Sequence, residues 1–303
     1  MAQSIGDESE TSSWRVVVFT MIADGMVYRL VEQLLEPFGH RVVGVVTTPG
    51  PKLRRSDDYL SVVGAVRPGV DVIVSTHPSR WAGMLVALNP DLIISCGFPY
   101  RIPADVISLP RLGAINVHPS LLPRHRGPWP LHWTFRAGDA EAGMTIHRLT
   151  SDFDEGPILA QGRVPVTDDD DGVSLMAKLT PLAANLLIES LPRIAAGDPG
   201  DAQEGTGTTE AGIFEEAWRM VDWDRTARDV HNQIRSWTGV AGGPCGAFAM
   251  VDGERYLVTR ARLEPSGLTG SVPPGSVVRR DAGEIIVQCG DGRLVLVEWE
   301  PAT

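Results

Sequence analysis

The sequence predicts an α/β protein, in which a doubly wound, mainly parallel sheet is followed by a smaller β-barrel domain. Up to about residue 200, short apolar runs rich in β-branched residues alternate with helical patterns. These runs have no polar face, as is typical of parallel strands covered by helices on both sides. Beyond residue 213, short alternating runs are separated by glycine or proline turns, which favours a small antiparallel barrel.

The elements of the first domain follow from these patterns in chain order. We expect strands at 14–20, 40–51, 70–76, 90–97 and 113–118, and helices at 26–38, 78–88 and 174–197. Pro181 lies in the last helical pattern, and we expect it either early in that helix or at a break that divides it. In the second domain we expect a helix at 226–238 and strands at 246–251, 255–263, 275–280, 284–289 and 293–299.

Composition shifts divide the chain into four segments. Residues 1–13 are polar and acidic, which predicts a disordered tail rather than a signal peptide. Residues 14–200 form the first domain, the glycine-rich residues 201–212 form a linker, and residues 213–303 form the second domain. The length of 303 residues fits two domains at roughly 100–200 residues each.

Charge and cysteine usage argue against several classes of function. The net charge is −11 and nearly all the positive charge is arginine, which argues against DNA and other non-specific nucleic-acid binding. The acidic run 168–171 is best interpreted as a solvated loop or helix start. Cys96, Cys245 and Cys289 have no metal-binding spacing, so we expect reduced, mostly buried thiols and a cytoplasmic protein. No apolar run reaches the roughly 18 residues that a membrane span needs.

The usual nucleotide-binding motifs are missing from the sequence. The first strand-to-helix turn reads FTMIADGM, without G-x-G-x-x-G, and no G-x-x-x-x-G-K-[ST] occurs elsewhere. The sheet is therefore not expected to bind NAD or a nucleoside triphosphate in the usual way.

Asn116 and His118 stand out at the end of the expected strand 113–118. Being two residues apart, their side chains point the same way, at the strand end where α/β sheets build sites. Alone, such a pair more often consists of satisfied polar residues that close a strand. The segments around it change this interpretation.

The ordered set HPSLLPRHRG, followed downstream by DFDEG, closely resembles the folate-dependent formyltransferase family. Its elements are the strand motif N-x-H, the loop S-L-L-P and an Asp-x-Gly turn. The segments NPDLIISCGFPYRIP, LPRLGAINVHPSLLP and AGMTIHRLTSDFDEGPILAQ match as well, so the resemblance is strong over most of residues 85–165. It implies a formyltransferase Rossmann-like fold with an OB-like C-terminal barrel, and an N-formyltransferase that uses 10-formyltetrahydrofolate.

The resemblance assigns chemical roles to three residues. Asn116 and His118 would stabilise the oxyanion of the tetrahedral species, and His118 is a candidate acid as well. Asp154, before the glycine of the turn, would orient the imidazole and organise proton movement. Asp152 is expected to structure the loop instead. Histidines 118, 125, 132 and 147 lack metal-ligand spacing, and the family chemistry needs no metal.

The same resemblance predicts the folate pocket. Backbone groups of Ser120, Leu121, Leu122 and Pro123 would line it, with Leu122–Pro123 a candidate cis peptide. Phe98 and Ile102 would contact the pterin, with ordinary packing as the alternative.

The acceptor is the least determined part of the prediction. Residues 215–253 resemble the start of the C-terminal domain of methionyl-tRNA formyltransferases, but the turn FTMIADGM and a short loop with Lys52, Arg54 and Arg55 depart from their pattern. We hypothesise a small amine acceptor, such as an amino sugar or amino acid. There are three alternatives: methionyl-tRNA as the acceptor, a hydrolase that releases formate from the formylated folate, and a non-catalytic folate-binding protein. Trp129 and Trp133 would either stack on the acceptor or pack between domains.

Overall fold

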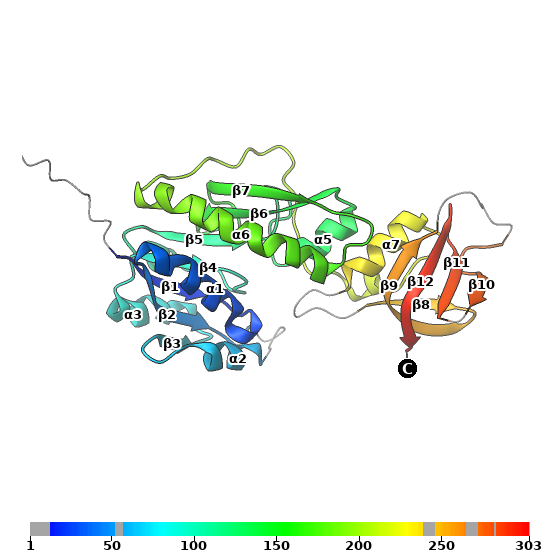
Figure 1. Ribbon diagram of the computed structural model, residues 1–303, viewed down its shortest axis with the longest axis horizontal. Helices are drawn as coiled ribbons and strands as arrows, with labels where there is room; N and C mark the ends of the chain where they lie inside the picture. Colours follow the sequence, from blue (N-terminus) through cyan, green and yellow to red (C-terminus); the bar gives the residue numbers. More distant parts are fainter. Residues whose placement is uncertain (1–12, 52–56, 239–245, 265–271, 282, 303) are drawn as a thin grey trace, which may run out of the picture. The chain divides into compact units, whose positions relative to one another are not determined.

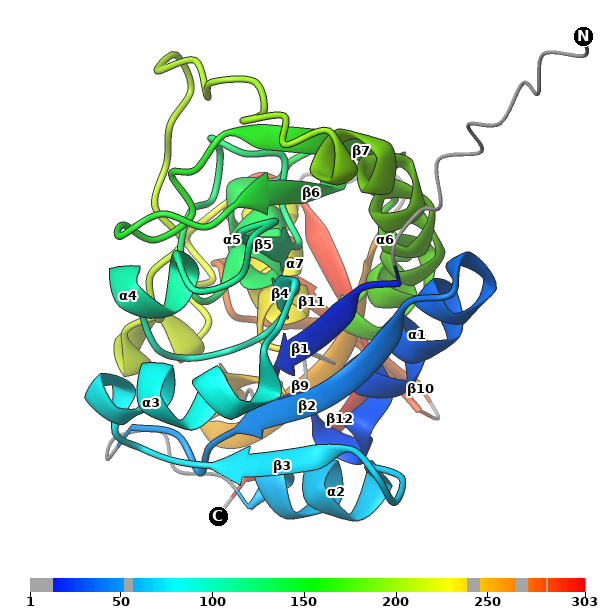
Figure 2. The same ribbon diagram turned by 90° about the vertical axis from the view of Figure 1, so that its left-hand side faces the viewer.

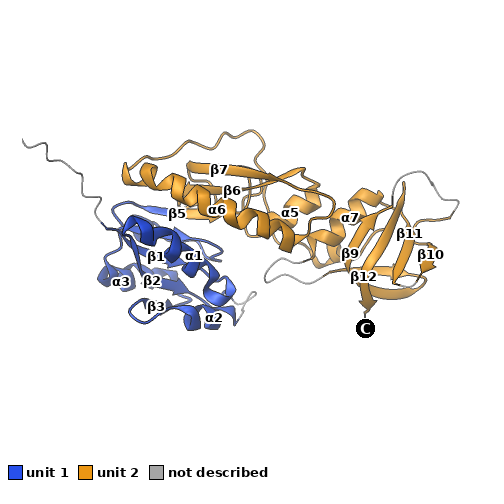
Figure 3. Cartoon of the chain, in the orientation of Figure 1, with its two compact units in different colours: residues 1–115 blue, residues 116–303 orange. Residues whose placement is uncertain are grey.

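The computed structural model describes residues 13–51, 57–238, 246–264, 272–281 and 283–302. The expected tail, apart from Ser13, lies outside these residues, as do Lys52, Arg54, Arg55 and Cys245. The chain divides into two compact units, residues 1–115 and 116–303 (Figure 3), and the division falls within one strand of the large sheet.

Unit 1 contains four parallel strands in the order β3-β2-β1-β4. The strands are β1 (Arg15–Phe19), β2 (Arg41–Thr47), β3 (Asp71–Val74) and β4 (Leu92–Ser95). The helices between them are α1 (Met26–Leu35), α2 (Asp58–Ala65), α3 (Trp81–Leu85) and α4 (Ala104–Ile107), with short 3-10 turns at Ala23–Gly25, Glu36–Phe38, Pro78–Arg80 and Val86–Leu88. Figure 2 shows α1 and α3 on opposite sides of these strands, the doubly wound arrangement that the sequence predicts.

The position of each strand in the sheet explains how far it is buried. β1, β2 and β4 are almost wholly buried, as their unbroken apolar runs predict. β3 is different, because it is the edge strand of the sheet and Val74 is 46% exposed. Its apolar run predicted a strand covered on both faces, so that part of the prediction was wrong. An apolar run does not say how many neighbours a strand has.

The turn that lacks the dinucleotide motif is tight for a different reason. Asp24 and Gly25 both have left-handed backbones, with φ of 60° and 59°. A Cβ added to Gly25 would lie 2.4 Å from the Cβ of Ala65, so α2 leaves no space for a side chain there. This glycine serves the packing of α1 against α2.

In unit 2, the strands of the large sheet are neighbours in the order β5-β6-β7 (Figure 1). They are β5 (Ala114–His118), β6 (Glu141–Arg148) and β7 (Ile158–Pro165), and β6 and β7 are antiparallel. Helix α5 (Pro130–Ala137) precedes β6, and α6 (Gly172–Ala195) packs on β6 and β7.

Helix α6 runs unbroken through Pro181, with a second proline at 192. Pro181 therefore neither lies early in the helix nor divides it, contrary to both expectations. Leu179, Ala183 and Leu186 on the two sides of it are buried. Their burial against the sheet offsets the backbone hydrogen bond that a proline removes.

The C-terminal part of unit 2 has the five strands that the sequence predicts, in an antiparallel sheet of order β10-β11-β12-β9-β8. They are β8 (Ala247–Val251), β9 (Glu254–Leu263), β10 (Val277–Asp281), β11 (Glu284–Gln288) and β12 (Arg293–Pro301). Helix α7 (Ala227–Ser236), preceded by a 3-10 turn at Glu216–Arg219, packs on this sheet and on α5.

An aromatic core joins this part to the loop that follows β5. Trp129 makes edge contacts with Phe214 and Trp237, and Trp133 makes one with Phe214 and donates a 2.6 Å hydrogen bond to the carbonyl of Gly212. The two tryptophans therefore pack against the C-terminal core, which was the alternative to acceptor stacking. No helix within the described ranges is long and apolar enough to cross a membrane.

The first prediction concerns the start of α6, where Asp171 and Ser174 form a reciprocal capping box with bonds of 2.8 and 3.0 Å. Replacement of Asp171 by alanine removes the acceptor for the Ser174 N–H. We expect Asp171→Ala to lower the free energy of unfolding by about 1 kcal/mol, measured by urea denaturation. Asp169→Ala removes an exposed neighbouring carboxylate and is the control. Equal stability of both variants would contradict the role of the cap.

Candidate active site

Asp154 lies at the centre of a buried polar cluster in unit 2. It belongs to the turn between β6 and β7, has a left-handed backbone with φ of 55°, and is only 7% exposed. Its Oδ2 accepts a 2.8 Å hydrogen bond from the backbone N–H of Gly127. Its Oδ1 faces Nδ1 of His118 at 3.5 Å and accepts from Nδ2 of Asn116 at 3.3 Å. The structure thus brings together the three residues that the sequence singled out.

A fourth residue, His147, completes the cluster from β6. Its Nε2 lies 3.6 Å from Asp154 Oδ1 and 3.2 Å from Asn116 Nδ2. The sequence patterns offer His147 only as a weak metal-ligand alternative and do not predict its place in this cluster. The signal was available, because His147 sits at the end of β6, next to the end of β5.

Hydrogen-bond partners assign the protons on the two imidazoles. Nε2 of His118 lies 2.9 Å from the carbonyl oxygen of His125, which can only accept, so Nε2 carries a proton. Nδ1 of the neutral ring is then unprotonated and faces Asp154. In His147 the Nδ1 proton is donated to the carbonyl of Arg148 at 2.9 Å, and Nε2 lies 3.2 Å from Asn116 Nδ2 and 3.6 Å from Asp154 Oδ1.

The pKa of His118 and the pKa of Asp154 are both lower than usual, for different reasons. Burial lowers the pKa of His118, and the nearby Asp154 carboxylate only partly opposes this. Burial raises the pKa of Asp154. His118, His147 and the N–H of Gly127, which face the carboxylate, outweigh burial and lower the pKa to about 2. Because its pKa is lowered, His118 is cationic only at acidic pH, and there its charge lowers the pKa of Asp154. At neutral pH the site therefore holds an anionic carboxylate beside a neutral imidazole.

The loop after β5 is fixed by side chains from the β6–β7 hairpin. Thr145 donates from Oγ1 to the carbonyl of Ser120 at 2.7 Å, and Gln161 donates to the carbonyl of Leu122 at 2.9 Å. Leu121 packs so closely on Gly143 that a Cβ there would meet it at 2.3 Å. The Leu122–Pro123 peptide is cis, as expected. These bonds hold the loop predicted to line the folate pocket.

Phe98 and Ile102 belong to unit 1. Phe98 has ring contacts with Phe19, Trp81 and Tyr100 at centroid distances of 5.1–6.0 Å, and Ile102 is 5% exposed. Both residues thus take part in the packing of that unit, and their contact with a pterin stays a prediction.

The remaining histidines have other roles. His125 Nε2 lies 2.6 Å from Asp139 Oδ2, and His132 stacks on Trp129. In the part of the chain that the structure describes, no group of three or more His, Cys, Asp or Glu side chains is arranged to hold a metal ion.

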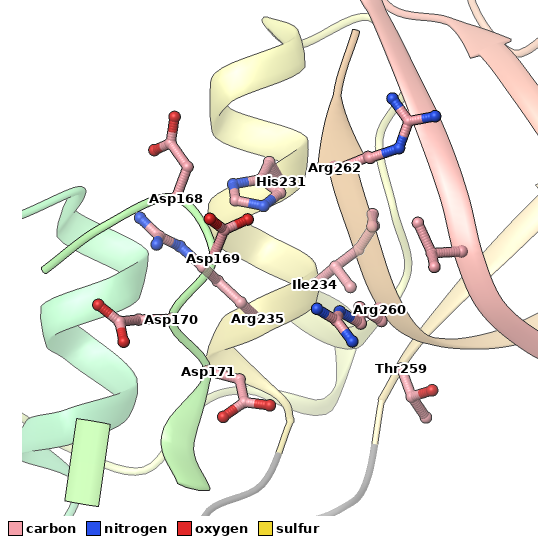
Figure 4. A pocket seen from close by; sticks show the side chains of 12 residues that line it. Asp168, Asp169, Asp170, Asp171, His231, Ile234, Arg235, Thr259, Arg260 and Arg262 are labelled. Carbon is pink, nitrogen blue, oxygen red and sulfur yellow. The ribbon is translucent and has the colours of Figure 1, made fainter. Parts of the chain in front are cut away.

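A hollow of about 200 Å³ lies elsewhere in unit 2, between the acidic run and the residues of α7 and β9 (Figure 4). Asp168 pairs with Arg228, and Asp170 pairs with Lys178 at 2.6 Å. Asp171 begins α6. The acidic run is thus a loop and a helix start, as the sequence predicts, but Asp170 is buried and therefore not solvated.

Comparison with known proteins places this cluster in a family. The formyl transferase profile matches residues 16–191, and the profile of the formyl transferase C-terminal domain matches residues 215–303. The chain belongs to the formyl transferase family. It is 31% identical to a methionyl-tRNA formyltransferase of Enterococcus faecalis over 276 residues, which are 89% of this chain and 86% of the relative.

Solved structures agree on the fold. HypX from Aquifex aeolicus in complex with tetrahydrofolic acid superposes with a TM-score of 0.66 at 20% identity, covering 96% of this chain and 45% of HypX. The sugar 3N-formyl transferase WlaRD superposes with a TM-score of 0.66 at 13% identity, covering 96% of this chain and all of WlaRD. The predicted family, fold class, enzyme class and formyl-folate co-substrate are thus confirmed for this formyltransferase.

The second prediction follows from the low pKa of Asp154. Its value of about 2 lies below the ordinary 3.8, so ionisation stabilises the fold above about pH 4 and the contribution disappears as the pH falls through 2. We expect the stability difference between wild type and Asp154→Asn to shrink by about 2 kcal/mol over that range, measured by urea denaturation. Asp152→Asn, which changes an exposed carboxylate two residues away, is the matched control. A difference independent of pH would contradict the assigned ionisation.

Proposed function

We propose that this formyltransferase moves the formyl group of 10-formyltetrahydrofolate to the primary amine of a small acceptor, such as an amino sugar or an amino acid. The observation that carries the reaction is the contact of Asn116 and His118 with one buried, ionised carboxylate, Asp154. Donors and a proton carrier at one point are what acyl transfer between two nitrogens requires.

Asn116 is the proposed oxyanion donor. Its amide N–H groups face Asp154 Oδ1 at 3.3 Å and His147 Nε2 at 3.2 Å. These bonds are long, and an oxyanion that develops beside them competes for the same N–H groups. Such a preset donor stabilises the tetrahedral species more than it stabilises the substrate.

His118 is the proposed proton carrier. At neutral pH its Nδ1 is free to take a proton from the attacking amine as the C–N bond forms. Asp154 stabilises the resulting imidazolium, and its own pKa of about 2 makes it too weak a base to take the proton. The imidazolium then protonates the folate nitrogen as the bond to the formyl carbon breaks. The carboxylate thus stays charged throughout.

Charge pairing in the C-terminal part favours a small acceptor. Acidic side chains outnumber arginines in residues 213–303, and no lysine occurs there. Most arginines of this part lie within 4 Å of a carboxylate, in the pairs Arg219–Glu216, Arg225–Asp229, Arg228–Asp168, Arg260–Glu298, Arg262–Glu284, Arg279–Asp281, Arg280–Asp252 and Arg293–Glu264. A tRNA would have to displace these carboxylates to reach the cations, which weakens its binding.

Methionyl-tRNA is the second candidate acceptor. Methionyl-tRNA formyltransferases are similar to this chain over both proposed domains, residues 14–200 and 213–303. WlaRD, which has the same fold, is a sugar 3N-formyl transferase. The fold therefore serves acceptors of either kind.

The third prediction separates these acceptors. We expect formyl transfer from 10-formyltetrahydrofolate to amino sugars or amino acids, and little transfer to charged initiator methionyl-tRNA assayed side by side. Efficient formylation of the tRNA would contradict the small-acceptor proposal and identify methionyl-tRNA as the acceptor. Release of formate without any acceptor would identify a hydrolase instead, and folate binding without turnover would indicate a non-catalytic protein.

The fourth prediction uses the pH profile of kcat/KM. Because transfer requires neutral His118, activity should fall with decreasing pH below the usual histidine range, as its lowered pKa dictates. The Asp154 carboxylate raises that pKa, so Asp154→Asn should move the acid limb to lower pH while kcat falls by about 10²–10⁴-fold. Asp152→Asn should leave both unchanged. An acid limb that moves to higher pH in Asp154→Asn would rule out this assignment.

A further inference from the structure

Gln203, in the segment expected to be a linker, is hydrogen-bonded to the turn that carries Asp154. Its Nε2 donates to the backbone carbonyl of Asp154 at 2.7 Å and to that of Gly156 at 2.8 Å. Both N–H groups of the amide therefore have a partner in one turn. A side chain that only covered the surface would not need two such bonds.

The other end of the same amide is held by Arg126. Oε1 of Gln203 accepts from Nε of Arg126 at 3.1 Å and from Nη2 at 2.7 Å. Nη1 of Arg126 lies 3.3 Å from Glu155 in the Asp154 turn. Gly127, the next residue along the chain, donates the N–H that binds Asp154 Oδ2. Gln203 thus links the two backbone segments that meet at the carboxylate.

Neighbouring residues of the same segment hold the rest of this loop. Thr209 accepts the N–H of His125 on Oγ1 at 2.9 Å, and the backbone N–H of Arg126 bonds to the carbonyl of Thr209 at 2.9 Å. Trp129 donates its backbone N–H to Ala211 at 3.0 Å. The carbonyl of His125 is the group that binds Nε2 of His118. Residues 203–211 therefore contact both loops of the site.

The Asp154 turn needs such support because its backbone is strained. A left-handed aspartate with φ of 55° is sparsely populated, and such conformations persist only where surrounding contacts fix them. A Cβ on Gly156 would lie 1.7 Å from the carbonyl oxygen of Arg148, so only a glycine fits where the turn passes the end of β6. The two bonds from Gln203 restrain the turn through its own carbonyls.

We propose that Gln203 is a positioning residue for formyl transfer: it fixes the Asp154 turn against the 125–127 loop, so that the carboxylate faces His118 and the N–H of Gly127. The proposal rests on the proposed function. Gln203 acts through Asp154, and the contacts given above join it to Arg126, Asp154 and Gly156 rather than to the residues that would bind the folate.

The fifth prediction tests this role with Gln203→Leu, which keeps the volume and removes all four bonds. We expect kcat to fall roughly 10- to 100-fold, the scale of a misplacement of about 1 Å, with the KM for 10-formyltetrahydrofolate unchanged. A second readout needs no turnover. By ¹³C NMR titration of the carboxyl, the pKa of Asp154 should rise from about 2 toward 3.8, because its N–H donor and imidazoles move away.

Gln233 offers a matched control in α7. Its Nε2 also donates to two backbone carbonyls, those of Trp218 and Met220, both at 2.7 Å. Gln233→Leu should lower the melting temperature while leaving the pKa of Asp154 unchanged. Gln203→Glu keeps the acceptor for Arg126 and loses both donors, so its kcat should fall as in Gln203→Leu.

The charged and titratable groups around Asp154 are His118 from β5, His147 from β6 and the Arg126–Glu155 pair beside the turn. None is changed in Gln203→Leu or Gln233→Leu, whereas Gln203→Glu adds a carboxylate near Asp154, so that variant is compared by its kcat alone. An unchanged Asp154 pKa in folded Gln203→Leu would overturn the proposal, as would a wild-type kcat in Gln203→Glu. A raised pKa in a chain that transfers no formyl group would support the positioning role and reject only the proposed function.

Discussion

The site depends on one constraint: a carboxylate must stay ionised at a buried point where three chain segments meet. Asp154 is 7% exposed, and burial alone would favour its neutral form. The imidazoles of His118 and His147 and the backbone N–H of Gly127 reverse that preference and keep the pKa low. His118 comes from β5, His147 from β6 and Gly127 from the loop, so the charge of Asp154 depends on the assembly of all three.

The same constraint explains why the linker segment matters. A turn with a left-handed aspartate is not stable by local preference, and its partners lie far away in the sequence. Gln203 reaches it from beyond α6, and Thr209 of the same segment bonds to His125 in the neighbouring loop. The segment that connects the two family domains therefore also supports the loops of the proposed site. Among the described residues of the C-terminal part, most arginines are paired with carboxylates, which is the basis of the proposed small acceptor.

Much of the fold was predictable because strands and helices are encoded locally. Unbroken apolar runs predicted the buried strands β1, β2 and β4, and glycine and proline turns predicted the five C-terminal strands. Two expectations were wrong for reasons that are not local. β3 is partly exposed because it lies at the edge of the sheet, and α6 continues through Pro181 because the sheet beneath it stabilises the helix on both sides.

Sequence alone determined the family and the formyl-transfer chemistry, through its resemblance to known formyltransferases. The same resemblance pointed to Asn116, His118 and Asp154 on a strand and a turn, which are the proposed site residues. Tertiary structure alone decided what surrounds them. His147 joins the site because β6 lies next to β5, and Gln203 joins it because the chain returns after α6. It also decided the charge of Asp154 and the proton on His118. Both depend on burial and on partners that no linear pattern records.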